Sequence, residues 1–239
     1  MSGSDALRAA IDRCRKGHAL PAAFHLDRSI YEDELEAIWR RSWLLAGCSV
    51  EAPGPGDFFR FELGDDSVVV VRDEGGTLHA LHNTCRHRGM PVCVHEAGNV
   101  SRWVCPYHQW SYGLNGQLLG TGGIGEELDA AEHGLHRAAV DEVGGLGFVW
   151  LAGEPEPFEP ARDELEVALA RQGLSRAKVA HRIDYELRAN WKLVWQNNRE
   201  CWHCHAGHPE YIRSNFDAVP DTPACATWRG RAQPSTSDC

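Results

Sequence analysis

The stretch that decides the fold of this chain is a pair of short boxes, Cys85-Arg86-His87 and Cys105-Pro106-Tyr107-His108. Each box brings one cysteine close to one histidine, and seventeen residues, numbers 88–104, separate the two boxes. Thiolates and neutral imidazoles are side-chain groups that bind iron and zinc in proteins. The boxes therefore predict a metal centre with two sulfur and two nitrogen ligands.

Two kinds of centre use this ligand set. In a Rieske [2Fe-2S] cluster, two imidazoles replace two thiolates on one iron, which raises the reduction potential. Many structural zinc sites also use two cysteines and two histidines. The one-residue spacer of the first box, the order Cys-His then Cys-His, and the absence of a finger-like helix pattern favour the cluster. We expect two loops from adjacent hairpins to hold one cluster, with the imidazole edges facing outward, through Cys85, His87, Cys105 and His108.

The surroundings of the boxes have the pattern of β-strands. Short β-rich runs, separated by Gly, Asp or Asn, occupy residues 58–62, 67–72, 77–81, 102–105, 117–119 and 146–151. Asn115-Gly116 is a hairpin signal directly after the second box. We predict a small antiparallel β domain that carries the cluster.

Helical patterns flank this domain. Residues 5–15 and 29–43 have helical spacing, and Ser29 with Glu32 resembles a capping box. After the turn-rich residues 153–157, we expect a helix over 163–172, a strand over 180–187, and a helix from Trp191 to about His205 that ends near Pro209. The fold class is therefore α+β, divided into residues 1–43, 44–153 and 154–239.

Composition excludes several partners. The chain has 239 residues, 43% of them hydrophobic, and a net charge of -10. This acidity disfavours binding to nucleic acid or to anionic lipid. The N-terminus lacks a signal-peptide run and no stretch approaches a membrane span, so we expect a cytoplasmic protein. In that compartment the nine cysteines favour metal binding or plain burial over disulfides. Cys48, Cys93 and Cys225 are expected to be buried.

A second metal signal lies near the C-terminus. Glu200 precedes His203 by three positions, so both lie on one face if this segment is a helix, and His208 could fold back from beyond the helix end. Two imidazoles and a carboxylate form the facial triad of non-haem Fe(II) oxygenases. Other interpretations are open: Cys201 and Cys204 could be a redox pair or half of a zinc site, His205 could replace His203, or these could be ordinary surface histidines.

The two segments together resemble the α subunit of the Rieske non-haem iron oxygenases, also called aromatic-ring-hydroxylating oxygenases. The resemblance rests on residues 85–89 and 105–112 for the cluster, and on 190–192 and 200–210 for the mononuclear iron. It extends from Ser29 to about Tyr211. Gln109, together with residues 197–201, is similar to the branch that acts on quaternary ammonium compounds such as glycine betaine, stachydrine or carnitine.

The resemblance implies a function and an assembly. The Rieske domain would precede part of a helix-grip (Bet v1-like) catalytic domain, on which residues 1–43 pack. The enzyme would use O2 to hydroxylate or N-demethylate a small organic substrate, with electrons from NAD(P)H through a reductase or ferredoxin. In a homotrimer, Glu200 would connect His203 of its own chain with His108 of the next. His203 and His208 would bind Fe(II), and a carboxylate next to an imidazole N–H fixes the tautomer of that ligand.

One departure from the family pattern concerns the third iron ligand, an acidic residue that the family places far downstream. The acids after Glu210 are Asp217, Asp221 and Asp238, which we expect to be loop residues. The chain is therefore expected to be C-terminally truncated: a fragment, a truncated gene product, or one half of a split enzyme that needs a partner polypeptide. A Rieske ferredoxin-like electron carrier and an inactive truncated oxygenase are the alternative functions.

Overall fold

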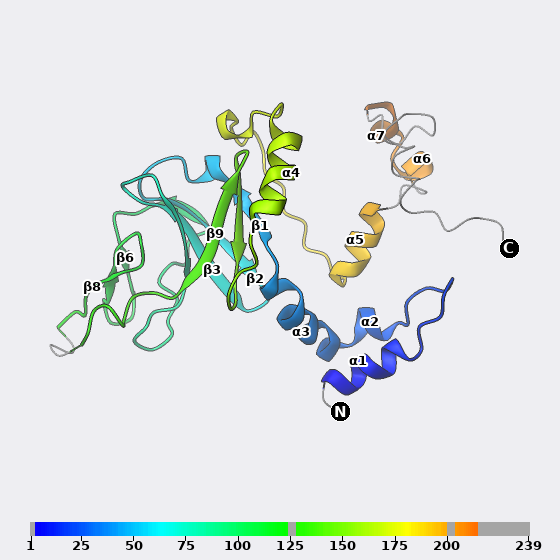
Figure 1. The fold of residues 1–239 in the computed structure, drawn as a ribbon, viewed down its shortest axis with the longest axis horizontal. Helices are drawn as coiled ribbons and strands as arrows, with labels where there is room; N and C mark the ends of the chain where they lie inside the picture. Colours follow the sequence, from blue (N-terminus) through cyan, green and yellow to red (C-terminus); the bar gives the residue numbers. More distant parts are fainter. Residues whose placement is uncertain (1–2, 124–127, 200–203, 215–239) are drawn as a thin grey trace. The chain divides into compact units, whose positions relative to one another are not determined.

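The structure is a computed structural model that describes residues 3–123, 128–199 and 204–214 (Figure 1). It divides into two compact units. The larger unit is Tyr31–Asp184, and the smaller unit combines Met1–Ile30 with Tyr185–Cys239. Each unit is described by itself. The expected mixture of helices with an antiparallel β domain is confirmed.

A seven-stranded antiparallel sheet forms the centre of the larger unit. Its strand order is β1-β10-β9-β4-β3-β2-β5. The strands are β1 (Leu44–Cys48), β2 (Asp57–Leu63), β3 (Asp66–Arg72), β4 (Leu78–His82), β5 (Ala97–Asn99), β9 (Arg137–Val143) and β10 (Leu146–Trp150). Sequence runs predicted β2, β3, β4 and β10, whereas β1, β5 and β9 were missed.

Alternate residues of β3 pack into two different hydrophobic cores. Val69 and Val71 pack with Cys85 and Cys105 on one face of the sheet. Val68 and Val70 face the other way and pack in a second cluster around the β1 and β10 strands. This alternation follows from the period of two along a strand. Both faces of β3 are buried, which accounts for its continuous run of valines. One of these faces packs in the same cluster as Cys85 of the first box.

A small three-stranded sheet carries the second box. Its strands are β6 (Trp103–Val104), β7 (Ser111–Tyr112) and β8 (Leu118–Gly120), in that order. The hairpin predicted at Asn115-Gly116 connects β7 with β8. Gly116 has a φ of +84°, and a Cβ at this position would lie 2.7 Å from Leu81 Cδ2. The turn therefore requires glycine both for its backbone conformation and for its close approach to the large sheet.

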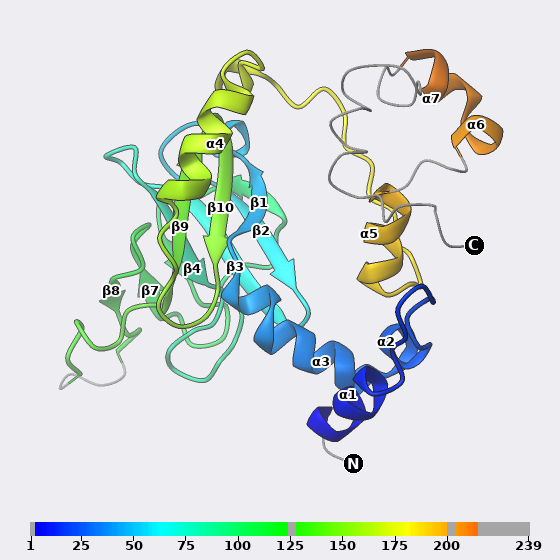
Figure 2. The same cartoon turned by 45° about the vertical axis from the view of Figure 1, so that its right-hand side comes forward.

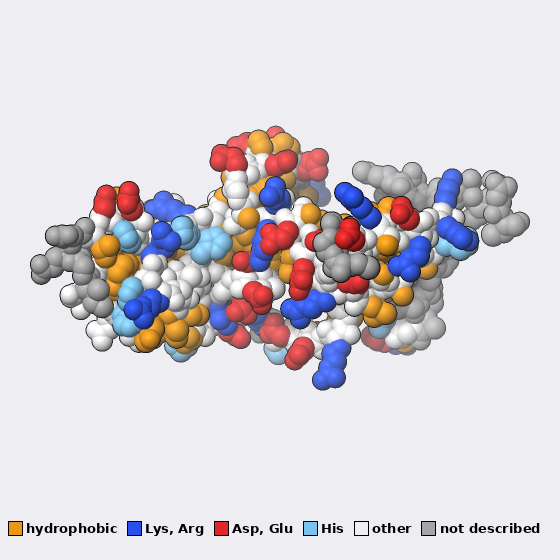
Figure 3. All heavy atoms as spheres, turned by 90° about the horizontal axis from the view of Figure 1, so that it is seen from below, with side chains coloured by type: hydrophobic (Ala, Val, Ile, Leu, Met, Phe, Trp, Pro, Cys, Tyr) orange, Lys and Arg blue, Asp and Glu red, His pale blue; other side chains and the backbone are white. Residues whose placement is uncertain are grey.

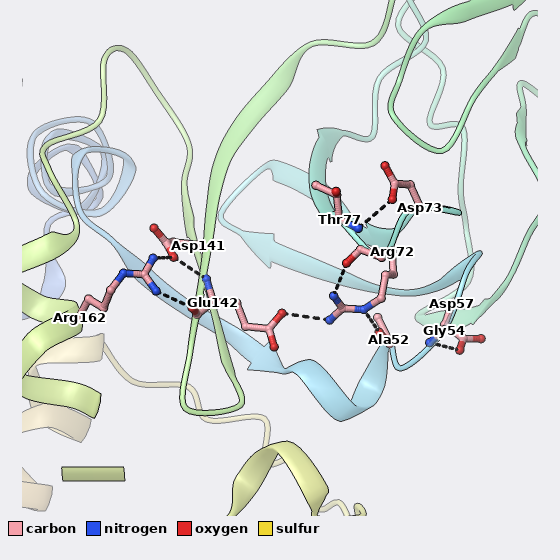
Figure 4. Close-up of polar contacts among 10 residues, drawn as sticks. Ala52, Gly54, Asp57, Arg72, Asp73, Thr77, Asp141, Glu142 and Arg162 are labelled. Carbon is pink, nitrogen blue, oxygen red and sulfur yellow. Dashed lines mark hydrogen bonds and ion pairs between the residues drawn. The ribbon is translucent and has the colours of Figure 1, made fainter. Parts of the chain in front are cut away.

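The C-terminal helix of the larger unit is tied to the sheet through polar contacts (Figure 4). This helix, α4 (Glu159–Leu169), lies beside β9 and β10 (Figure 2). Arg162 donates to the carbonyl of Glu142, at 3.0 Å, and also pairs with Asp141. Arg72 bonds the Ala52 carbonyl at 2.7 Å and the Glu142 carboxylate at 3.0 Å. The Arg162 contacts therefore tie α4 to β9, and the Arg72 contacts tie β3 to β9 and to the segment before β2.

The remaining helices are short. The larger unit also contains most of α3 (Arg28–Ala37), the 3-10 turns η1 (Trp39–Arg41), η2 (Ser49–Glu51) and η3 (Leu174–Arg176). In the smaller unit, Ala6, Ala10 and Ile30 form a small core between α1 (Gly3–Ile11), α2 (Ala23–Leu26) and the start of α3. The same unit includes α5 (Trp191–Arg199), α6 (Cys204–Gly207) and α7 (Pro209–Ser214).

Several helix predictions need correction. Ser29 does not cap a helix: α3 begins at Arg28, and the carboxylate of Asp27 accepts the Ser29 amide at 2.9 Å. The helix expected to reach residue 43 ends at Ala37 and continues as the η1 turn. α4 begins at Glu159, earlier than expected, because Pro160 lies in the first turn, where a missing N–H costs nothing. Pro209 begins α7 for the same reason.

The strand expected over residues 180–187 is not formed within the described part of the chain. These residues are extended and exposed, and they have no strand partner there. The buried cysteine prediction holds for Cys93, while Cys48 is half-buried and Cys225 lies outside the described residues. Within the described ranges, every helix is too short or too polar to span a bilayer.

Candidate metal centre

The first box lies on a loop that follows β4. The amide of Cys85 donates to the carbonyl of Met90 at 2.8 Å, and the amide of Gly89 donates to the carbonyl of Cys85 at 2.9 Å. Gly89 has a φ of +75°, in the left-handed region that glycine adopts without strain. The loop thus turns the chain back on itself directly after His87.

The second box repeats this backbone arrangement in the loop between β6 and β7. The amide of Cys105 donates to the carbonyl of Trp110 at 2.8 Å, and that of Gln109 donates to Cys105 at 3.0 Å. Gln109 takes the position of Gly89, with a φ of +60°, and is the one non-glycine residue with positive φ in the described ranges. The expected pair of loops is present, although only the second connects neighbouring strands of one sheet.

Asn83 closes the first loop. Its side chain donates to the carbonyl of Cys93 at 2.7 Å and accepts the amide of Cys93 at 2.8 Å. The amide side chain thereby imitates the hydrogen-bond pair of a β ladder, and it is buried. Asn83 joins the end of β4 to the segment that leaves the box, which fixes the position from which Cys85 projects.

The four predicted ligands share one environment. Cys85 and Cys105 are buried in the same core, at 2% and 1% exposure. The imidazole rings of His87 and His108 lie edge to face, with centroids 4.6 Å apart. The Nδ1 atoms of both rings are buried and have no hydrogen-bond partner. Buried polar atoms normally have a partner, so these two nitrogens fit a group that binds there.

The donor set suits a two-iron cluster better than a single ion. Within the described ranges, no group of three or more His, Cys, Asp or Glu side chains is placed to hold one metal ion. A zinc site would need all four ligands around one ion. In a Rieske cluster each iron takes only two protein ligands, the thiolates on one and the imidazoles on the other. The residues present therefore fit a [2Fe-2S] cluster.

Tyr112 is a neighbour of the thiols that sequence patterns did not single out for a role. Its hydroxyl lies 3.2 Å from Cys85 Sγ and accepts the Arg86 amide at 3.1 Å. Burial, followed by the contact with Cys85, raises the pKa of Tyr112 well above its usual value. The phenol therefore stays protonated and can donate a hydrogen bond to a thiolate. No local pattern could have revealed this contact, which joins residues 27 positions apart.

The charge around the histidines favours neutral imidazole. Desolvation lowers the pKa of His87, and the nearby His108 and Arg88 lower it further. Neutral imidazole is the form that binds a metal. Arg88 and Arg102 are exposed, and Figure 3 shows His together with Lys or Arg side chains, beside acidic ones, at the surface of the end that carries β6 and β8.

The second metal signal falls mostly outside the described residues. Glu200, His203 and the side chain of His205 lie outside the part of the chain that the structure describes. His208 lies between α6 and α7, where its amide donates to the carbonyl of Cys204 at 2.9 Å and its side chain is exposed. Cys204 is buried and disulfide-bonded, which does not fit a thiolate ligand of zinc. The facial triad remains a sequence prediction.

Two segments of the chain match known protein families. Residues 42–125 match the family described as Rieske [2Fe-2S] domain. Residues 174–234 match the family described as ring hydroxylating alpha subunit (catalytic domain). The first match includes both boxes, and the second includes Glu200, His203 and His208. The two matches follow one another along the chain in this order.

Several curated proteins are similar to this chain over most of its length. The glycine betaine monooxygenase oxygenase subunit of Chromohalobacter salexigens is 41% identical over 221 residues, covering 91% of this chain and 50% of the relative. The subunit of that name from Pseudomonas aeruginosa is 39% identical, with 92% and 52% covered. Biphenyl dioxygenase subunit alpha of Paraburkholderia xenovorans is 31% identical, with 90% and 50% covered. The chain spans about half the length of these relatives.

Solved structures agree with the fold. The quaternary ammonium Rieske monooxygenase CntA in complex with L-carnitine matches with a TM-score of 0.75 and 27% identity, covering 82% of this chain and 56% of that chain. Naphthalene 1,2-dioxygenase from Rhodococcus sp. bound to indole matches with a TM-score of 0.74 and 28% identity, with 87% and 50% covered. The chain spans about half the length of each of these solved chains.

Proposed function

Because this chain belongs to the Rieske oxygenase α-subunit family, we propose that it binds one [2Fe-2S] cluster and passes electrons toward a mononuclear non-haem Fe(II) site for an O2-dependent oxidation. One observation carries the proposal. Two buried thiols and two buried imidazole nitrogens without hydrogen-bond partners belong to one pair of matching loops. This is the donor set that a Rieske cluster needs.

Each residue of the site has a defined task in this proposal. Cys85 and Cys105 bind one iron, and His87 and His108 bind the other through Nδ1. When bound, the cluster accepts and returns a single electron at a potential that the two histidines raise. The core around the cysteines excludes water, and the hydroxyl of Tyr112 donates to Cys85. His87 and His108 are half-buried whereas both cysteines are buried, so the imidazole side of the site would be the side open to an electron-transfer partner.

The mononuclear site is the second part of the proposal. His203 and His208 bind Fe(II), and Glu200 connects this site to His108 of a neighbouring copy in a homotrimer. The match of residues 174–234 to the catalytic-domain family supports this assignment. A carboxylate that accepts an imidazole N–H orients the ring and raises its basicity as a ligand. Glu200 thereby acts on both metal sites without binding either.

The substrate class follows from the relatives. Relatives named for glycine betaine, and a structure with bound L-carnitine, support a small quaternary ammonium substrate, oxidised by N-demethylation or hydroxylation. A reductase or ferredoxin, fed by NAD(P)H, supplies the electrons. The exposed Arg88 and Arg102 beside the cluster loops favour a donor protein with an acidic docking face.

A second candidate function is electron transfer alone. It is favoured by one observation, namely that all four predicted cluster ligands lie in the larger compact unit, Tyr31–Asp184. In this case residues 44–153 act as a Rieske ferredoxin-like domain. Substrate-dependent O2 consumption with a reductase separates this function from the oxygenase.

The deciding experiment combines metal analysis with spectroscopy. We expect the reconstituted chain to contain acid-labile sulfide and, after dithionite reduction, to show an EPR signal with the low average g value of mixed His/Cys ligation. His108→Ala should abolish the signal, whereas Cys14→Ser, at an exposed free thiol, should leave it unchanged. A reduced wild-type sample without this signal contradicts the proposal.

The mononuclear site has its own test. We expect iron in excess of the cluster content, and His203→Ala should remove this excess while leaving the Rieske signal intact. His205→Ala is the matched control, because His205 is the competing ligand in the same segment. Loss of the excess iron in His205→Ala alone would transfer the ligand role to His205. No excess iron in any sample would favour the electron-transfer function.

A further inference from the structure

The ring of Trp110 lies against a proposed cluster ligand. The indole and the imidazole of His87 are nearly parallel, with an interplanar angle of 10° and centroids 5.1 Å apart. The His87 ring also meets His108 edge to face. Trp110 is buried, at 3% exposure, and belongs to the core that also contains Cys85 and Cys105. A rigid core side chain therefore covers one face of this imidazole.

Within the described residues of one chain, the contacts of the His87 imidazole are ring contacts. A histidine that binds a metal usually donates its second ring N–H to a carboxylate or carbonyl, which fixes the orientation of the ring. Within the described residues, His87 makes no hydrogen bond through either ring nitrogen. Only ring contacts then determine the plane of the imidazole, and the contact with Trp110 is the parallel one.

We propose that Trp110 is a positioning residue for His87: its indole holds the plane of the imidazole so that Nδ1 faces the iron. This inference rests on the proposed cluster. Trp110 is itself fixed by the backbone, since its carbonyl accepts the Cys105 amide that closes the second loop. The two loops are thus coupled, because a residue of the second loop orients a ligand of the first.

The chain offers a matched control in Trp103. This side chain is equally buried, at 2%, and belongs to the same core. Its ring packs on Phe58 at 5.0 Å, and the structure shows it in no ring contact with a histidine. The indole N–H groups of both tryptophans are buried without a partner. Substitutions at Trp103 therefore remove the same side-chain volume and the same buried N–H as substitutions at Trp110. They do not remove the ring that lies against His87.

The test compares reconstituted full-length variants by EPR and by the rate of cluster loss to an iron chelator. Trp110→Met keeps an apolar side chain without a ring, and Trp110→Phe keeps a smaller ring. We expect Trp110→Met to shift the g values and to lose its cluster about tenfold faster than wild type, as for removal of an outer-shell partner. Trp110→Phe should lose its cluster about threefold faster than wild type, a rate between those of wild type and Trp110→Met. Trp103→Met and Trp103→Phe should keep wild-type g values and cluster lifetime.

Two results would overturn the inference. Wild-type g values and cluster lifetime in Trp110→Met would show that the indole does not orient His87. Equal changes in the Trp103 variants would reduce Trp110 to a core residue. If Trp110→Met does not fold, the pair Trp110→Phe and Trp103→Phe decides by the same two readouts. Failure of the proposed function is distinct, because the Rieske signal would then be missing from the wild-type protein.

Discussion

The hydroxyl of Tyr112 provides a direct means to adjust the electron affinity of the proposed cluster. A hydrogen bond to a thiolate stabilises the reduced, more negative cluster. Hydrogen bonds to charged groups contribute about 1.5–3 kcal/mol, and about 1.4 kcal/mol corresponds to roughly 59 mV for one electron. We therefore expect Tyr112→Phe to lower the midpoint potential by several tens of millivolts, with roughly 130 mV as the limit if the whole hydrogen-bond energy acted on the reduced state alone.

Protein-film voltammetry would measure this shift. Tyr107→Phe is the control, because the Tyr107 ring contacts His108 but its hydroxyl makes no hydrogen bond within the described residues. An unchanged potential in Tyr112→Phe would mean that the hydroxyl does not donate to Cys85 Sγ.

The left-handed positions of the two loops give a second prediction. A Cβ at Gly89 would meet no atom within 4 Å, so a substitution there tests backbone conformation alone. We expect Gly89→Ala to lower the free energy of unfolding by about 1 kcal/mol. Gln109→Gly should change it by less than about 1 kcal/mol, because relief of strain is offset by the entropy of the unfolded glycine. Urea unfolding measures both, and equal losses in the two variants would contradict the prediction.

The four cluster ligands could be predicted from the sequence, but the residues that contact them could not. The spacing within the boxes suffices to identify Cys85, His87, Cys105 and His108, because ligands on one loop are neighbours in sequence. The partners of these residues cannot be found in this way. Tyr112 meets Cys85, and Trp110 meets His87, only after β6 and β7 have paired beside the first loop. Such contacts depend on topology, which local patterns do not determine.

At the level of elements, Asn83 links the end of β4 to the segment after the first box. Asn83→Ala would leave the buried amide and carbonyl of Cys93 without their partner. We expect a loss of about 2–3 kcal/mol in the free energy of unfolding, measured by urea denaturation. Asn99→Ala is a suitable control, since Asn99 also bonds a carbonyl but is exposed in the edge strand β5. A loss no larger than that of the control would exclude the closing role of Asn83.

The turn between β3 and β4 gives a pH-dependent prediction. His79, followed by backbone amides including that of Thr77, lowers the pKa of Asp73 below its usual value. The folded protein then binds fewer protons at this site than the unfolded chain. This stability is present above the unfolded pKa, about 3.9, and is lost as the pH falls through the lower folded pKa.

Asp73→Asn should therefore weaken the decline of unfolding free energy below about pH 4, measured by urea denaturation at a series of pH values. The exposed neighbour Glu74, as Glu74→Gln, provides the comparison. A profile of Asp73→Asn that is identical to wild type would show that the hydrogen bonds around Asp73 do not depend on its charge.

Strands with a long apolar or alternating run could be predicted from the sequence, whereas short or polar strands could not. The valine run of β3 and the runs of β2 and β10 gave strands close to those observed. β5 and β7 have three and two residues, too few for a periodic signal. β9 carries charged residues that pair with Arg72 and Arg162, so polar contacts replace part of its apolar face. The order of strands in the sheet has no counterpart in local patterns.

At the scale of the whole molecule, the extended segment before α5 is an exposed apolar surface. Val179, Ile183 and Leu187 are 56%, 58% and 61% exposed and lie at every fourth position of the sequence. Exposed apolar side chains that lie close together in sequence favour association with another chain. We expect concentration-dependent self-association in analytical ultracentrifugation, reduced by Ile183→Lys. Glu186→Lys adds positive charge at a polar position of the same segment and should leave association unchanged; equal effects of the two would indicate a general charge effect.

The parallel contact between Trp110 and His87 also has an optical consequence. An iron bound to that imidazole would lie beside an indole whose centroid is 5.1 Å from the ring, close enough to quench its fluorescence. The emission of this one side chain, obtained as the difference between wild type and Trp110→Phe, would fall as the cluster assembles and recover as it is lost. The protein would thus carry a built-in fluorescent reporter of its own maturation.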